Sequence, residues 1–121
     1  MRLFHSFKYA FSGFFSAIKS EKNLKIHTII SALVIIAGIL FKISVTEWLA
    51  VLLCIALVIS VELLNTAIEK LSDFVCRQKN AEIGHIKDIS AAAVVVCAII
   101  SAAVGIIIFL PKVFANVKDV V

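Results

Sequence analysis

The sequence predicts an all-α integral membrane protein, in which an amphipathic surface helix precedes three transmembrane helices. Hydrophobic residues make up 62% of the 121 residues, and charged residues only 17%. A water-soluble domain of this size has too little interior to hide so many apolar side chains, so many of them must face lipid. The apolar residues also gather in long runs bordered by charges, as in helices that cross a bilayer. One membrane domain therefore accounts for residues 1–121.

Residues 1–20 have the pattern of a helix that lies in the headgroup layer. Lys8 and Lys19 fall on a different face from the apolar side chains, and Gly13 is the only weak helix former. The pattern predicts an amphipathic helix with an aromatic face in the membrane and a cationic face in water. The apolar residues recur at steps of three and four: Phe4, Phe7, Phe11, Phe14, Phe15 and Ile18.

Three further segments have the composition of transmembrane helices. We expect them at about residues 26–44, 47–75 and 86–110. The second is free of charge only as far as Val61, but its helical spacing continues, which predicts a cytoplasmic extension. The third has no charge between Ile89 and Leu110 and is expected to end at Pro111.

The distribution of cations predicts the topology. With three spans, nine of the twelve Lys and Arg residues fall on one side, and only Lys42, Lys112 and Lys118 on the other. The positive-inside rule places the N-terminus in the cytoplasm and the C-terminus outside. The net charge of +4 includes no dense Lys/Arg run. It therefore indicates attraction to anionic lipid headgroups rather than a nucleic-acid partner.

A stripe of polar residues continues the second apolar run. Glu62, Asn65, Glu69 and Asp73 are spaced three, four and four apart, so they project from a helix within an arc of about 80°. For Asp73 and Glu69, the solvated face of a cytoplasmic helical extension is as good an explanation as a functional site. It does not account for Glu62, which directly follows the uncharged run, because a carboxylate at that depth normally faces a protein interior or a wet cavity.

Other charged residues on the predicted cytoplasmic side can complete a phosphate site. Lys87 and Asp88 precede the third apolar run, where such a pair is either an interfacial anchor or, beside the stripe, a phosphate-binding pair. Glu21 lies in the connector before the first span and can add a carboxylate for Mg²⁺. His27, just inside that span, is interpreted as an interfacial polar residue. There is no P-loop motif and no protein-kinase motif.

Two of these segments together resemble a family signature. E-L-L-N-T-A-I-E-K-L-S-D at 62–73, followed by K-D-I-S-A-A-A-V at 87–94, is similar to the signature of the prokaryotic diacylglycerol kinase family. The similarity extends back to Glu21 and to N-L-K-I-H at 23–27, and covers nearly the whole chain up to about residue 112. The N-L-K-I-H stretch is more similar to the undecaprenol kinases of Gram-positive type.

The resemblance implies an ATP-dependent lipid kinase in a bacterial cytoplasmic membrane. It implies a homotrimer with active sites shared between subunits, and a lipid alcohol as acceptor, either undecaprenol or diacylglycerol. The loop at 78–83 departs from the family pattern, which leaves the adenine contacts open, as is the role of the tail at 112–121. The residue roles implied are Glu62 as general base at the lipid hydroxyl, Glu21 and Glu69 as Mg²⁺ ligands, Asn65, Lys87 and Asp88 as phosphate-organising residues, and Arg2 and Tyr9 as residues near the nucleotide.

A second function stays open on the residues alone. A transport or assembly subunit without enzymatic activity would also place carboxylates within a membrane, where they would form an ion pathway. Phosphorylation of a lipid by the purified protein separates the two functions.

Overall fold

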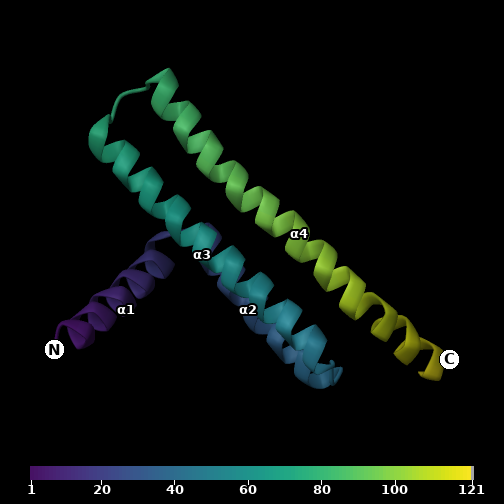
Figure 1. Cartoon of the computed structure of the whole chain (residues 1–121). Coiled ribbons are helices and arrows are strands. Elements are labelled where there is room, and N and C mark those ends of the chain that lie inside the picture. Colours follow the sequence, from purple (N-terminus) through teal and green to yellow (C-terminus); the bar gives the residue numbers. More distant parts are fainter. Residues whose placement is uncertain (121) are drawn as a thin grey trace.

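A computed structural model of the chain describes residues 1–120, and the part described consists of four α-helices joined by short connections (Figure 1). Residue 121, the last of the C-terminal tail, lies outside the described residues. α3 and α4 run antiparallel side by side, α2 packs against α3, and α1 leaves the bundle obliquely (Figure 1). The helices are α1 (Arg2–Ser20), α2 (Lys22–Leu40), α3 (Val45–Val75) and α4 (Ala81–Val120).

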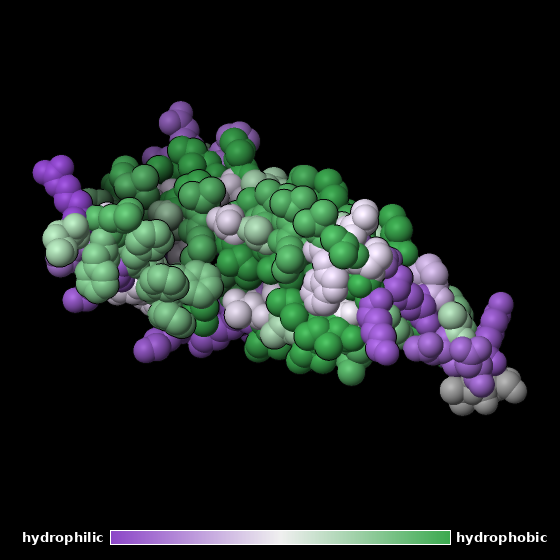
Figure 2. Space-filling view, turned by 60° about the horizontal axis from the view of Figure 1, so that its bottom comes forward, coloured by the Kyte–Doolittle hydropathy of each residue, from purple (hydrophilic) through white to green (hydrophobic). Residues whose placement is uncertain are grey.

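Three of the four helices are long and apolar enough to cross a membrane: α2, α3 and α4. Hydrophobic residues cover the middle of the elongated molecule, and hydrophilic residues gather towards its ends (Figure 2). This distribution matches a hydrocarbon layer flanked by two aqueous interfaces. The prediction of an all-helical chain with three helices fit to cross a membrane is confirmed, which indicates a multi-pass membrane protein.

A single residue separates α1 from α2. Glu21 has an extended backbone (φ −111°, ψ 116°), which ends α1 and begins α2. Ala17 and Leu24 on either side of this break are buried, and Leu24 is fully so. The break is therefore packed against the bundle, and the Glu21 carboxylate is held at the start of α2, where the helix dipole favours a negative charge.

The turn between α2 and α3 is fixed by backbone and side-chain hydrogen bonds. Lys42 adopts a left-handed conformation (φ 52°), and the amide of Ile43 donates to the carbonyl of Gly38 (3.2 Å), as in a helix C-terminus closed by a Schellman motif. Ser44 then begins α3 with a capping box: its hydroxyl accepts from the amide of Glu47, and its amide donates to the Glu47 carboxylate.

The apolar core lies at this same end of the molecule. Ile43, Val51 and Ile108 form its buried centre, with Trp48 packed against it. The Nζ of Lys112 on α4 donates to the Glu47 carboxylate at the start of α3 (2.6 Å) and also to the carbonyl of Ile108 (3.3 Å). Apolar packing and an ion pair therefore hold α3 and α4 together at the end opposite the α3–α4 loop.

α4 is longer than the expected third span at both ends. It begins at Ala81, because the Asn80 side chain accepts from the amides of Glu82 and Ile83 and caps the helix. It also continues through Pro111, where the sequence analysis expected an end. Proline removes one backbone donor, a loss that helices of membrane proteins tolerate. The limits of the part of α4 that lies within the bilayer stay a prediction.

α3 is the structural axis of the molecule. Its 31 residues give a length of about 46 Å, against about 30 Å for the hydrocarbon layer. The helix is therefore longer than an upright crossing needs, and its cytoplasmic extension stays a prediction. The polar stripe lies towards the end of α3 that leads into the α3–α4 loop.

The tight packing at Gly38 gives a testable prediction. A Cβ at this position would lie 2.7 Å from the Trp48 ring and 3.2 Å from Ile43. We expect Gly38→Ala to lower the free energy of unfolding in mixed detergent micelles by about 1–3 kcal/mol, the usual effect of overpacking. Gly105→Ala is the matched control, because a Cβ there meets nothing within 4 Å, and it should leave stability unchanged or slightly raised. A Gly38→Ala variant as stable as the wild type would contradict the packing described.

Candidate active site

The centre of the candidate site is a buried carboxylate. The side chain of Glu62 on α3 is only 3% exposed. Its Oε1 lies 3.3 Å from the Nε2 of His27 on α2. His27 is itself partly exposed, so the pair lies between the interior and the surface. An ionisable group at this depth without a polar neighbour would be costly, and the imidazole is the neighbour that the structure supplies.

The next residues of the stripe continue the polar site along α3. Asn65 is buried, and its Nδ2 donates to the Oε1 of Glu69 (3.4 Å). Its other polar atom, Oδ1, is buried and accepts no hydrogen bond from residues 1–120. Buried amide oxygens usually have a partner. This unpaired oxygen is therefore available to a cation or to a donor on a bound molecule.

A single chain brings three carboxylates towards one another. Glu21 and Glu69 both lie within electrostatic range of Glu62. The contacts of α1 with both α2 and α3 explain how Glu21, at the end of α1, reaches the stripe. From the sequence, nothing obliged Glu21 and Glu69 to meet within one subunit. In the structure each of them is within electrostatic range of Glu62 without a partner chain.

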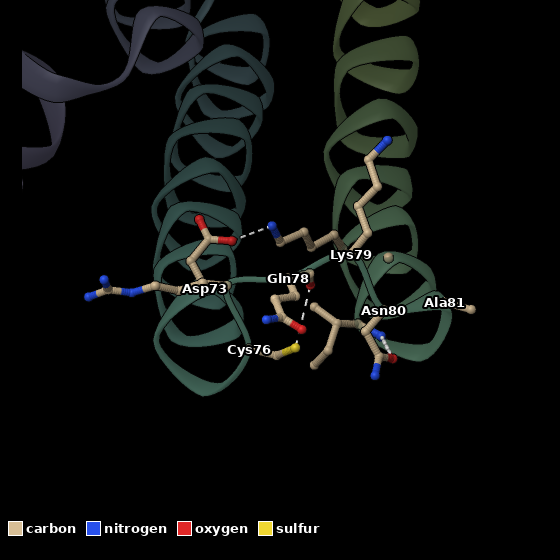
Figure 3. A pocket seen from close by; sticks show the side chains of 10 residues that line it. Asp73, Cys76, Gln78, Lys79, Asn80 and Ala81 are labelled. Atoms are coloured by element: carbon tan, nitrogen blue, oxygen red, sulfur yellow. Dashed lines mark hydrogen bonds and ion pairs between the residues drawn. The ribbon is translucent and has the colours of Figure 1, made fainter.

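Lys87 joins the stripe from α4 near the α3–α4 loop. Its ammonium forms an ion pair with Asp73, the exposed last member of the stripe (Figure 3). Lys87 is also within electrostatic range of Glu69. It lies inside α4 rather than at its start, because the helix begins six residues earlier at Ala81. Its position on a continuous helix fixes the ammonium beside the carboxylates.

A solvent-facing pocket of about 440 Å³ opens beside this ion pair. It lies between the end of α3 and the start of α4, and the loop that joins them forms its wall (Figure 3). Three cations and one carboxylate line it together with polar loop residues, a composition suited to an anionic molecule. The charged residues that line it are Asp73, Arg77, Lys79 and Lys87.

Three of the predicted site residues are not brought to the stripe. Asp88 is exposed on α4, and Arg2 and Tyr9 are exposed on α1. α1 has 19 residues, so Arg2 lies about 28 Å along the helix from Glu21. Figure 1 shows the N-terminal end of α1 away from the other helices. Within one chain, Arg2 and Tyr9 therefore do not reach the carboxylates, and their roles stay predictions.

The residues that gather here suit a hard cation such as Mg²⁺. Such an ion takes oxygen ligands and is often bound by one or two carboxylates together with substrate phosphates. Glu21 and Glu69 supply carboxylates, and the unpaired Asn65 Oδ1 is a further oxygen. Among residues 1–120, no three His, Cys, Asp or Glu side chains form a complete metal site. The donor set therefore fits a cation whose other ligands come from the bound substrate.

An apolar groove of about 360 Å³ begins at His27. Residues from α2, α3 and α4 line it, mostly with apolar or small side chains. His27 thus contacts Glu62 and also faces a groove between the helices that cross the membrane. The lining on α4 includes Ala98, Ala102 and Gly105, whose small size leaves this space open.

The contact between His27 and Glu62 was not predicted from the sequence. His27 was interpreted as an interfacial polar residue, whereas the structure pairs it with Glu62. One signal was available in the sequence. His27 and Glu62 lie at similar distances along the chain from the turn at residues 41–44, so an antiparallel α2–α3 pair places them at similar depth.

Comparison with known proteins adds independent findings. The sequence pattern of prokaryotic diacylglycerol kinase matches residues 8–109. An undecaprenol kinase of Bacillus subtilis (strain 168) is 39% identical over 111 residues, which cover 92% of this chain and 90% of the relative. A diacylglycerol kinase of Synechocystis is 36% identical over 107 residues, which cover 88% of this chain and 61% of the relative.

Proposed function

Because the chain belongs to the prokaryotic diacylglycerol kinase family and is therefore a lipid kinase, we propose that it transfers the γ-phosphate of Mg-ATP to the hydroxyl of undecaprenol. The observation that carries this proposal is the buried Glu62 with two further carboxylates and an unpaired amide oxygen around it. The reaction takes place at the cytoplasmic face of a bacterial cytoplasmic membrane, with the N-terminus inside and the C-terminus outside.

Glu62 acts as the general base. Its burial keeps water away from the carboxylate, and its place at the end of an apolar run puts it where a lipid headgroup meets the cytoplasm. A carboxylate oxygen of Glu62 takes the proton of the lipid hydroxyl as that oxygen attacks the γ-phosphorus. The lipid approaches from the bilayer and ATP from the cytoplasm, so the two substrates meet at this residue.

The other residues bind and position the phosphates. Glu21 and Glu69 would hold Mg²⁺, which would supply charge neutralisation at the phosphates. Asn65 holds Glu69 through its amide nitrogen and keeps its oxygen directed to the bound substrate. Lys87 contributes a positive charge to the phosphates, and Asp88, the next residue on α4, helps to organise them. Most of the rate acceleration then comes from positioning and charge stabilisation.

The choice of undecaprenol rests on similarity. The undecaprenol kinase relative is matched over nine-tenths of its length, whereas the diacylglycerol kinase relative is matched over 61% of its length. N-L-K-I-H at 23–27 also favours undecaprenol kinases of Gram-positive type. Its His27 contacts the proposed base, which gives this stretch a place in the site.

A lipid panel assayed with one preparation tests the function. We expect Mg-ATP-dependent transfer of ³²P to undecaprenol with a kcat/KM about tenfold or more above that for diacylglycerol. Omission of Mg²⁺ should abolish transfer. A higher kcat/KM for diacylglycerol would overturn only the choice of lipid. No transfer to either lipid would overturn the proposed reaction.

The role of Glu62 gives a second prediction for this site. Glu62→Gln keeps the shape of the side chain but removes its ability to take a proton, so kcat should fall about a hundredfold or more while ATP binding persists. Asp119→Asn is the control, because it neutralises an exposed carboxylate near the far end of α4 and should leave kcat unchanged. Activity of Glu62→Gln within a few-fold of the wild type would exclude Glu62 as the base.

We further propose a homotrimer in which α1 of one subunit serves the site of the next. The aromatic side chains of α1 are largely exposed, including Phe4, Phe7 and Phe11, which suits a helix lying in the headgroup layer. From there α1 reaches a neighbouring subunit and adds Arg2 and Tyr9 to its nucleotide site. This arrangement accounts for the distance between these residues and the stripe of their own chain.

Mixed assemblies test this sharing. Glu69→Ala and the double variant Arg2→Ala/Tyr9→Ala should each be inactive alone. Unfolded together at equal amounts and reassembled in detergent, they should recover about a quarter of wild-type activity, because a mixed trimer then holds one intact site. A mixture of Glu21→Ala with Glu69→Ala is the control and should stay inactive, because both residues serve the same site in one chain. No recovery in the first mixture would refute the sharing of α1.

A further inference from the structure

His27 is the nearest ionisable neighbour of Glu62 from another helix. Its Nε2 lies 3.3 Å from the Glu62 Oε1, whereas the polar residues next to Glu62 in the stripe, Asn65 and Glu69, are paired with each other. His27 follows the fully buried Leu24 by less than one turn of α2, so its backbone belongs to a packed part of the helix. From there the imidazole is directed at one oxygen of the carboxylate.

We propose that His27 is a positioning residue for the base. With a proton on Nε2, the imidazole donates to the Glu62 Oε1, so the second carboxylate oxygen is left to accept the proton of the lipid hydroxyl. A glutamate has three side-chain torsions, and restricting them before the reaction lowers the entropy lost on reaching the reactive geometry. The inference rests on the proposed function, because it assigns Glu62 as the base.

The place of His27 in the fold supports this role over a purely structural one. A core histidine that serves only packing would be enclosed, but His27 is partly exposed and forms one end of the apolar groove. The groove runs from His27 past Ser31 on α2 to Val104 and Gly105 on α4. The imidazole therefore contacts Glu62 and also lines the space that opens between the transmembrane helices.

The test is a double-mutant cycle on kcat with the full-length protein, undecaprenol and Mg-ATP. His27→Leu should lower kcat about tenfold or more, with the KM for ATP within about twofold of the wild type. His27→Gln can still present an N–H to Oε1 and should recover most of kcat. In a Glu62→Gln background, His27→Leu should lower the residual rate by less than about twofold, because a residue that acts through Glu62 has no effect once Glu62 is changed.

A neighbouring variant controls for local disturbance of α2. Thr28→Val is nearly isosteric, and the Thr28 hydroxyl bonds only to the backbone carbonyl of Leu24 (2.8 Å). It should leave kcat within about twofold of the wild type. If His27→Leu does not assemble, His27→Asn takes its place, because the shorter amide stays polar but does not span the distance to Glu62.

The outcomes separate this inference from the function on which it rests. Wild-type kcat in both His27→Leu and His27→Asn would overturn the positioning role while leaving the base assignment intact. The positioning role would also be overturned if the effects of His27→Leu and Glu62→Gln on kcat multiply in the double variant, because the two residues would then act independently. Glu62→Gln with near wild-type kcat would instead overturn the base assignment itself.

Discussion

The placement of one carboxylate at the end of a transmembrane run constrains the rest of the structure. Glu62 cannot face hydrocarbon without a large cost, so the helices around it must supply polar neighbours. α2 supplies His27, the break before α2 supplies Glu21, and the next turns of α3 supply Asn65 and Glu69. The apolar core lies at the opposite end, around Val51. The molecule is therefore packed by apolar contacts at one end and organised by polar contacts at the other.

The sequence predicted the helices better than the contacts between them. Apolar runs and helical spacing were enough to predict three helices fit to cross a membrane and the continuation of α3 to Val75, because these features depend on local composition. The start of α4 depends on a cap by the Asn80 side chain. The continuation of α4 through Pro111 depends on tolerance of one lost backbone hydrogen bond. Hydropathy shows neither of these features. The polar stripe on α3 was predictable from the helical periodicity of its residues alone. The partner of Glu62 was harder to predict from the sequence, because His27 belongs to another helix and only the antiparallel packing brings the two residues together.

The single chain leaves much of its surface without protein contacts. Most side chains of α4 are exposed, and the buried Asn65 Oδ1 has no partner in residues 1–120. An exposed apolar helix is stable in lipid, so the apolar side chains of α4 need no contact with another protein element. A buried polar oxygen is different, because lipid offers it no donor. The described residues therefore leave one buried acceptor of the candidate site open to a donor or cation from outside the chain.

The uninterrupted length of α3 has a consequence for the membrane in which the protein works. Glu47, which anchors the core end, and Glu62 are on the same rigid helix, separated by about 22 Å of axial rise. This separation is shorter than the hydrocarbon layer of about 30 Å, so with Glu47 at one interface an upright α3 leaves Glu62 below the opposite headgroups. A thicker bilayer places Glu62 deeper, and a thinner one brings it closer to the headgroups, unless the helices tilt to compensate. Bilayer thickness thereby becomes a physical variable that sets how deep this carboxylate lies relative to the lipid headgroups.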